Sequence, residues 1–419
     1  MRILITTDSF PPGCGGSGWS TYELARGLRD RGHTVVLMQP RPGEPRDTLH
    51  AYDGFQVRRL AFAAPDLPFV RNYFKHERLT RLLEPRIRRV VREERIDIAH
   101  GQHVLTCPAT VAAARAERVP VVCTVRDYWP ICYWSDLIHD PRAEALCPAC
   151  SSAMMTRCVR PRAGAAWPLA LPMIPYMGAT LRRKRRQLSD ASAVVAVSTA
   201  IARDLAQRAP ELRRTRIEII PNPVDVAALA EIRAEPPDRA ADPYAIYVGK
   251  LAPNKGVAKL FAAIERAQLR WPLVVVGDGP DRAALERLGA AARVPVSFTG
   301  WLDRDDALAK LRAASLLVFP SHGPESLSRV LLEASALGVP IAAMDTGGTS
   351  DIVEHDVTGL LARSTDELGD AVAKLAGDPA LRARLGAAAR SKVAATFDTP
   401  RVVGRLEDLY RSLLAERRA

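Results

Sequence analysis

The sequence predicts an α/β protein built from two doubly wound domains, and three observations support this class. The chain has 419 residues, which suits two domains of roughly 200 residues better than one. In both halves, short β-branched apolar runs alternate with amphipathic segments of helical spacing. Continuous apolar strands that alternate with helices are typical of parallel sheets covered by helices on both faces.

The first half opens with an apolar run that predicts a strand, and a glycine-rich loop then leads to the first helix. Similar runs recur along this half with amphipathic segments between them. The predicted strands are 3–6, 34–38, 56–60, 98–100, 119–125 and 193–197, and the predicted helices include 21–31, 77–94 and 199–208.

The second half repeats the pattern after a segment rich in turn residues, which runs from Pro221 and Pro223 to the proline pair at 236–237. The predicted strands are 244–248, 273–276, 296–299, 316–319 and 341–344, and the helices include 259–267, 283–291, 305–314 and 327–337. We therefore expect domains at 1–222 and 223–400, with ligands beyond the carboxyl ends of the strands.

The net charge of +12 favours anionic partners, but no nucleic-acid recognition motif accompanies it, so we expect no nucleic-acid partner. Residues 151–189 hold eight Arg or Lys and no acidic residue. Within them, the uncharged stretch 163–181 contains three prolines that argue against a spanning helix, and a basic run follows at 182–186. Peripheral membrane contact through 163–186 and a loop packed on its own domain both remain open.

The N-terminal strand is too short for the apolar region of a signal peptide, and no cleavage pattern follows it. We expect a cytoplasmic protein, with a peripheral position at the inner face of the plasma membrane as the alternative. The seven cysteines would then stay reduced. Four of them are candidate ligands of a structural zinc, with free thiols as the alternative: Cys132, Cys147, Cys150 and Cys158.

A glycine-rich loop at residues 13–18 follows the first strand and precedes a helix, for which Ser20 is a plausible N-cap. Its glycines, Gly15 and Gly16 among them, let backbone amides approach a phosphate or a sugar. Two other interpretations stay open. Arg41 would suit the 2′-phosphate of NADP, and the loop could be a flexible surface turn.

Two lysines follow the strand 244–248, and a glycine lies beside each of them. Gly249 precedes Lys250, and Lys255 precedes Gly256. Ammonium groups on a loop at the carboxyl end of a strand suit a diphosphate, whose negative charge needs partners. Solvated surface lysines are the simpler alternative for these two residues taken alone.

The segment 320–340 carries two carboxylates, Glu325 on a loop and Glu333 on a helix. Carboxylates accept paired hydrogen bonds from vicinal hydroxyls, so this pair suits the two sugars of a nucleotide-sugar. Glu333 lies in an apolar stretch, where a carboxylate needs a reason. The backbone amides at the start of the helix suit the diphosphate, and the residues there are Ser326, Leu327 and Ser328.

Taken in order, these motifs resemble the family-4 retaining glycosyltransferases of the GT-B fold. The further segments that carry the resemblance are 197–198, 220–225 and 276–280. The resemblance implies two Rossmann-like domains that face each other across a cleft, a last helix within 401–419 that packs on the first domain, and a donor site in the second domain. It implies no catalytic metal, and the sequence Asp303-Arg-Asp305 is read as a helix cap.

The resemblance also implies roles for individual residues. Lys250 and Lys255 would hold the donor diphosphate, Glu333 the ribose and Glu325 the transferred sugar. The base pocket would lie at residues 300–302, with Gly300 and Leu302 on its walls. The implied reaction moves a hexose from UDP or GDP to a hydroxyl of a sugar or lipid-linked acceptor, in glycan, glycolipid or cell-envelope polysaccharide synthesis.

The chain departs from the family pattern at three positions. Lys250 stands where the family usually has Arg, and Ser328 where it usually has Gly. Arg126 precedes Asp127 where the family carries a His that touches the transferred sugar, and a guanidinium cannot exchange a proton near neutral pH. Two alternatives therefore remain beside the enzyme: a glycosyltransferase-like partner subunit with weak or no activity, and an NADP-dependent oxidoreductase. His100 and His103 are equally open to a site role and a structural one.

Overall fold

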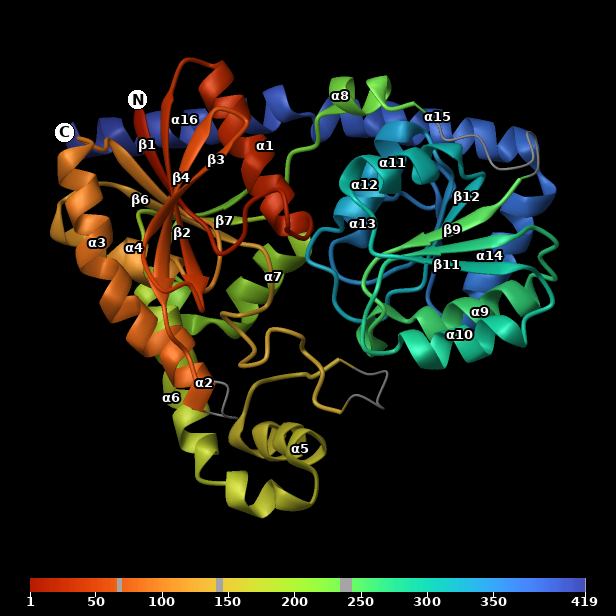
Figure 1. Ribbon diagram of the computed structural model, residues 1–419, viewed down its shortest axis with the longest axis horizontal. Coiled ribbons are helices and arrows are strands. Elements are labelled where there is room, and N and C mark those ends of the chain that lie inside the picture. Colours follow the sequence, from red (N-terminus) through yellow and green to blue (C-terminus); the bar gives the residue numbers. More distant parts are fainter. Residues whose placement is uncertain (66–69, 141–145, 234–242, 419) are drawn as a thin grey trace. The chain divides into compact units, whose positions relative to one another are not determined.

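The computed structural model describes residues 1–65, 70–140, 146–233 and 243–418 (Figure 1). They form two compact units. The first contains Met1–Asp140, Cys147–Pro223 and Thr399–Ala419, and the second consists mainly of Val224–Asp398. Each unit is an α/β layer structure around its own sheet, so the predicted class of two doubly wound, Rossmann-like units is confirmed.

Unit 1 is built on an eight-stranded sheet with the strand order β3-β4-β2-β1-β5-β6-β7-β8. All neighbouring strands are parallel except β3 and β4, which form an antiparallel edge pair. The strands are β1 (Arg2–Thr6), β2 (Thr34–Pro42), β3 (Thr48–Tyr52), β4 (Phe55–Phe62), β5 (Ile98–Gly101), β6 (Val121–Val125), β7 (Ala193–Ala196) and β8 (Ile217–Ile219). The sequence did not predict β3 and β8, which are short and largely exposed and therefore lack a continuous apolar run.

The helices of unit 1 connect these strands. They are α1 (Gly16–Asp30), α2 (Val70–Tyr73), α3 (Leu79–Glu93), α4 (Cys107–Ala116), α5 (Ser152–Ala163), α6 (Met173–Ser189), α7 (Thr199–Arg208) and α16 (Thr399–Arg418), with short helical turns at Phe74–Arg78, Gly164–Ala170 and Pro210–Leu212. Helix α1 begins at Gly16 with Gly15 as its N-cap, so the prediction of Ser20 as the cap is wrong. The last glycines of the loop therefore form the first turn of a helix.

Helix α16 closes the core of unit 1. Its apolar face packs against β1 and β5 in one cluster with Ile3, Ile5 and Ile98. Tyr410 on this helix is fully buried, and its hydroxyl lies 2.5 Å from His100 Nδ1. Glu407, 3% exposed, lies 2.6 Å from Arg31 Nε and 3.0 Å from His33 Nε2. The last segment of the chain is therefore part of the first unit.

Unit 2 is built on a six-stranded parallel sheet with the order β11-β10-β9-β12-β13-β14. Its strands are β9 (Ala245–Val248), β10 (Leu273–Val276), β11 (Val296–Gly300), β12 (Leu316–Phe319), β13 (Ile341–Met344) and β14 (Leu360–Ala362). Its helices are α8 (Val226–Glu231), α9 (Val257–Arg266), α10 (Arg282–Ala290), α11 (Arg304–Ala313), α12 (Arg329–Leu337), α13 (Thr349–Ile352), α14 (Thr365–Gly377) and α15 (Pro379–Thr396), with a turn at Pro253–Lys255. Because β9 and β12 are central neighbours, the loops that follow them meet at the same edge.

Three details of unit 2 differ from the prediction. Strand β14 was not predicted from the sequence. Helix α12 begins at Arg329 rather than at residue 327, since Ser328 has an extended backbone as its N-cap. Asp303 does stand at the N-cap of α11, but its side chain makes no capping hydrogen bond. Among the described residues, no helix is both long and apolar enough to cross a membrane.

Candidate functional site

The loop after β9 presents the two predicted lysines in different ways. Lys250 is exposed, whereas Lys255 is half-buried at the end of a short turn. Gly256 follows with a φ of +65°, and a Cβ there would lie 2.1 Å from the Pro320 carbonyl oxygen. Only glycine allows this left-handed backbone and this close approach. The contact places Lys255 beside the loop that follows β12.

Lys255 and Glu325 form the centre of the site in unit 2. The Lys255 Nζ lies 2.6 Å from Glu325 Oε1, and the Ser321 hydroxyl donates to the same oxygen at 2.5 Å. Glu325 is only 8% exposed. Its carbonyl oxygen accepts a hydrogen bond from the Gly348 amide at 2.7 Å, so the loop after β13 also holds it. Three strand-end loops therefore fix one ammonium–carboxylate pair.

Glu333 has two arginine partners that sequence reasoning missed. Its Oε1 lies 2.9 Å from Arg329 Nε and 3.0 Å from Arg304 Nη1. Arg329 is 8% exposed and belongs to the first turn of the same helix. The four-residue spacing of Arg329 and Glu333 was the available signal. The ion pairs with these two arginines therefore account, at least in part, for a carboxylate in this apolar helix.

The remaining predicted donor residues lie at neighbouring ends of the same sheet. Gly300 ends β11 with a φ of +72°, and its carbonyl oxygen accepts from the Gly277 amide. Leu302 is half-buried, and Trp301 between them is 69% exposed. Ser326, Leu327 and Ser328 form the chain between Glu325 and the first turn of α12. The structure therefore gathers the predicted donor residues of unit 2 at strand ends and at one helix start.

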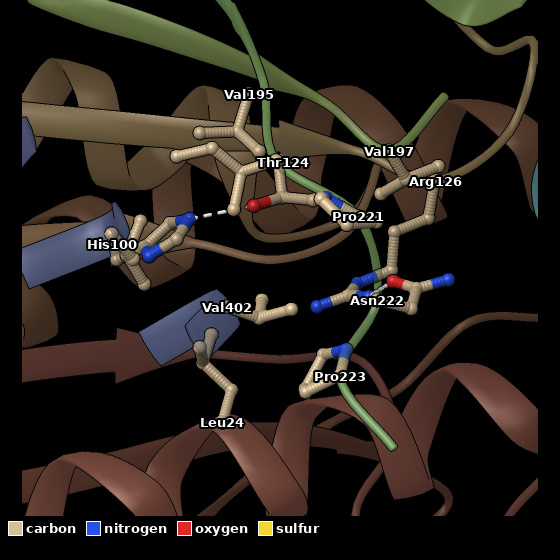
Figure 2. Close-up of a pocket in the computed structure, with 12 residues that line it drawn as sticks. Leu24, His100, Thr124, Arg126, Val195, Val197, Pro221, Asn222, Pro223 and Val402 are labelled. Atoms are coloured by element: carbon tan, nitrogen blue, oxygen red, sulfur yellow. Dashed lines mark hydrogen bonds between the residues drawn. The ribbon is translucent and has the colours of Figure 1, made fainter. Parts of the chain in front are cut away.

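In unit 1, Arg126 follows β6 and lines a small pocket (Figure 2). Its guanidinium donates to Asn222 Oδ1 and to Gln102 Oε1, and the residue is 8% exposed. Figure 2 shows Arg126 and Asn222 together on one side of this pocket, with His100 on the other. Arg126 is therefore anchored by two amides, whatever it contacts in addition.

His100, which the sequence left open to a site role or a structural one, has a structural role. Its Nε2 lies 2.7 Å from the Thr124 hydroxyl, and its Nδ1 contacts Tyr410. Burial, with the charge of Arg126 as a second cause, lowers its pKa to about 3, so the ring is neutral at physiological pH. Both ring nitrogens are used within the fold.

Asp127 sits next to Arg126, and burial raises its pKa to about 6 although the residue keeps some exposure. The Trp129 amide donates to Asp127 Oδ1 at 2.8 Å. Lys184 on α6 is 5% exposed, and its positive charge acts on Asp127 in the opposite direction to burial. Sequence reasoning did not single out Lys184, since it lies within a run of basic residues.

The two glycines of the first loop lie where α1 begins. Gly15 is its N-cap, and Gly16 is its first residue. A Cβ added at Gly15 would meet no atom within 4 Å, so open space lies beside this backbone. The free amides of a helix N-terminus suit an anionic group.

The four clustered cysteines line one small pocket in unit 1: Cys132, Cys147, Cys150 and Cys158. All have free thiols, and burial raises the pKa of Cys132 to about 11 and that of Cys158 to about 12. In the described part of the chain, no group of three or more His, Cys, Asp or Glu is placed to hold a metal ion. The structural zinc therefore stays a prediction without geometric support.

Comparisons with known protein families assign both halves of the chain. The model described as "Glycosyltransferase Family 4" matches residues 14–228, and the model "Glycosyl transferases group 1" matches residues 230–392. Together they cover most of both units.

Several curated proteins resemble the chain in sequence. A GDP-mannose-dependent α-(1-6)-phosphatidylinositol monomannoside mannosyltransferase of Mycobacterium tuberculosis is 34% identical over 201 residues, which are 45% of this chain and 52% of that protein. A glycogen synthase of the same species is 25% identical over 98% of this chain and 94% of its own length. The match to the first of these thus spans about half of the relative.

Solved structures share the fold over nearly the whole chain. A sucrose-phosphate synthase from Thermosynechococcus elongatus has a TM-score of 0.70 at 20% identity, with 99% of this chain and 100% of that chain covered. HepE from Anabaena in complex with UDP-glucose has a TM-score of 0.68 at 19% identity, with 98% and 100% covered. At these identities the likeness concerns the fold.

Proposed function

The chain belongs to the family-4 glycosyltransferases of the GT-B fold, and from this premise we propose that it moves a hexose-type sugar from a UDP- or GDP-linked donor to an acceptor hydroxyl with retention of configuration. One observation carries the proposal. Lys255, Glu325 and Ser321 converge at the carboxyl ends of β9 and β12, where a doubly wound sheet binds its ligand. The family match argues against the NADP-dependent oxidoreductase considered from the first glycine loop.

In the proposed donor complex, the ammonium groups of Lys250 and Lys255 bind the diphosphate. An ammonium group has three donors, and Lys255 uses one of them on Glu325. Negative charge grows on the diphosphate as the glycosidic bond breaks, so cations fixed beforehand stabilise the transition state more than the ground state. The backbone amides from Ser326 to Ser328 add donors at the start of α12.

Glu333 binds the ribose hydroxyls in this proposal. Arg304 and Arg329 hold its Oε1, and an ionised carboxylate has further acceptor sites on both oxygens. The two arginines are thus positioning residues that orient the carboxylate. Trp301, exposed between Gly300 and Leu302, offers a flat apolar surface for the base.

Unit 1 carries Arg126 and Asp127 after β6, and the proposal gives them a role of their own. In place of an imidazole, Arg126 donates hydrogen bonds to the transferred sugar and takes no part in proton exchange. No catalytic metal is required, since the lysines supply the positive charge. Acceptors are sugars or lipid-linked sugars of glycan, glycolipid or envelope polysaccharide synthesis, a substrate class consistent with the curated relatives.

We further propose that α5, the turn Gly164–Ala170 and α6 contact an anionic membrane surface. Leu169 in this turn is 84% exposed, and Leu171 follows it at 37%. The guanidinium of Arg160 lies over the ring of Trp167 at 5.6 Å. Apolar side chains at the tip of a basic segment without acidic residues suit the interface of a membrane with anionic lipids.

Product analysis with a panel of UDP- and GDP-sugars tests the proposed reaction. A thermal shift with one donor selects the nucleotide, and mass analysis after incubation with sugar acceptors detects transfer. Because Arg126 stands in place of the family His, one competing outcome is that the chain binds a donor and transfers no sugar, as a partner subunit would. A chain that neither binds nor transfers any nucleotide-sugar contradicts the proposal.

A further inference from the structure

Three polar residues that the proposed mechanism does not use meet at one edge of the sheet in unit 1. Asp8 follows β1, and Gln102 and His103 follow β5. Strands β1 and β5 are parallel neighbours in the sheet, so their carboxyl ends lie side by side. Asp127, which follows the next strand β6, is close enough that its charge acts on Asp8.

The hydrogen bonds of His103 fix its tautomer. The backbone N–H of Asp8 points to Nδ1 at 3.3 Å, and the Thr7 hydroxyl lies 3.1 Å from the same nitrogen. A backbone amide can only donate, so Nδ1 accepts and the proton of the neutral ring is on Nε2. Burial lowers the pKa of this histidine to about 3, with Arg126 as a second cause, and the ring is therefore neutral.

The Nε2–H of His103 is a buried donor without a use in the fold. The residue is 8% exposed, and Nε2 has no hydrogen-bond partner among the residues that the structure describes. Gln102 is fully buried, and its Oε1 accepts a hydrogen bond from Arg126. Its Nε2 likewise has no hydrogen-bond partner among the described residues. Folded proteins pair nearly all buried polar groups, so two such donors in consecutive residues point to a ligand.

Asp8 supplies the matching acceptor. Its Oδ2 accepts from the Leu105 amide at 3.1 Å, whereas Oδ1 is buried and unpaired within the described residues. Desolvation is the largest cause that raises the pKa of Asp8 to about 7, and the nearby charge of Asp127 acts in the same direction. Hydrogen bonds from Leu105 and Thr106 to this carboxyl group act on its pKa in the opposite direction.

A hydroxyl group both donates and accepts, so one hydroxyl suits an unpaired donor and an unpaired acceptor at the same edge of the sheet. We propose that Asp8 Oδ1 and His103 Nε2–H bind one hydroxyl of the acceptor substrate, with Gln102 Nε2 as a second donor, so that these residues select a polyhydroxylated acceptor. This inference rests on the proposed function and names the residues that choose the acceptor.

Two substitutions at His103 separate the ligand contact from the structural one. His103→Asn places an oxygen near the position of Nδ1, where it accepts the Asp8 amide, and it removes the donor at Nε2. His103→Gln instead places an amide nitrogen near Nε2. Asp8→Asn keeps an acceptor for the Leu105 amide and removes the charge. Asp190→Asn, on an exposed residue of the same unit paired with Arg115, is the control.

The probes are methyl α-glucoside, methyl α-mannoside and myo-inositol, each beside its monodeoxy analogues, with saturation-transfer NMR as the binding readout. We expect the protein to bind at least one probe and to lose about tenfold in affinity for one deoxy analogue. In His103→Asn and Asp8→Asn the parent probe binds about tenfold more weakly and the deoxy analogue no worse than before. His103→Gln recovers part of the loss.

Donor hydrolysis is measured as release of UDP or GDP without an acceptor. It distinguishes failure of the proposed acceptor site from failure of the proposed glycosyltransferase function. Variants that keep hydrolysis and lose probe binding support the inference. Unchanged probe binding in both variants overturns it, and so does a wild-type protein that binds no probe, since the unpaired atoms would then hold ordered water only. Absence of donor hydrolysis and donor binding in the wild type would instead contradict the proposed function.

Discussion

At Glu333 the structure changes how the donor site must be tested. The carboxylate pairs with the buried Arg329 and with Arg304, so truncation to alanine removes the negative member of an ion pair inside the protein. Removing one member of a buried ion pair destabilises a fold by about 3–5 kcal/mol. A loss of binding in Glu333→Ala would then mix lost contact with lost structure, and Glu333→Gln, which keeps the shape, is the informative change.

The raised pKa values of Asp8 and Asp127 predict a pH-dependent stability. Burial raises both from 3.8, to about 7 and about 6 respectively. The folded state therefore holds protons that the unfolded state has lost, and the stabilising contribution, full below pH 4, decreases as pH rises towards 7. Asp8→Asn should raise the midpoint of thermal unfolding more at pH 8 than at pH 4.5. An equal effect at both values would show that Asp8 ionises normally.

Several site residues could be predicted from sequence because their chemistry is local to a motif. The lysine loop and the carboxylate loop each follow a strand, and parallel strand ends share an edge, which is why Lys255 and Glu325 do meet. Arg304 was noticed only as part of a predicted helix cap, and Asp8 only as the end of the first strand, so neither was recognised as part of a site. Their role depends on which strands and helices become neighbours.

At the level of elements, Gly256 joins the two loops of the donor site. An alanine there adopts a left-handed backbone and brings its Cβ to 2.1 Å from the Pro320 oxygen. We expect Gly256→Ala to lose about 2 kcal/mol or more of unfolding free energy and to weaken donor binding. Gly404→Ala within α16 is the control, because a Cβ there meets nothing within 4 Å and should stabilise the helix by up to about 1 kcal/mol. Denaturant titration measures the unfolding free energy of both variants. Equal stability of the two would contradict the role given to Gly256.

The turn Gly164–Ala170 is the element on which membrane contact depends. We expect the protein to sediment with phosphatidylcholine vesicles that contain phosphatidylserine and not with phosphatidylcholine alone. Leu169→Glu should abolish this binding, because it adds a negative charge at an 84% exposed apolar tip. Leu49→Glu, at a leucine 69% exposed on β3, is the matched control. Equal binding of both variants would place the contact elsewhere.

Strand prediction succeeded for the central strands and the edge strand β11, and it missed the other three edge strands, β3, β8 and β14. The sequence runs 244–248 and 316–319 contain β9 and β12, because central parallel strands are apolar throughout. The edge strands β3 and β8 alternate or are polar and gave no signal. The start of α1 was placed too late, because glycines disfavour a helix unless tertiary contacts fix them.

For the molecule as a whole, the last helix belongs to the first unit. Helix α16 contributes Val402, Val403, Leu406, Leu409 and Tyr410 to the core that contains β1 and β5. A chain that ends at Asp398 exposes these strands and leaves His100 without the Tyr410 hydroxyl. We expect unit 1 to lose its cooperative unfolding transition while unit 2 keeps its own. Calorimetry of the truncated chain tests this, and two preserved transitions would contradict it.

The central claim is that unit 2 holds a nucleotide-sugar through Lys255 and Glu333. Isothermal titration with the preferred donor nucleotide measures it most directly, in the wild type, Glu333→Gln, Lys255→Met and Lys374→Met. Lys374 is the matched control, an exposed lysine of the same unit that lies 3.5 Å from Asp356. The account predicts that Glu333→Gln and Lys255→Met each weaken binding at least about tenfold, as loss of a charged hydrogen bond implies, while the control binds like the wild type. Wild-type affinity in Glu333→Gln and Lys255→Met would contradict it.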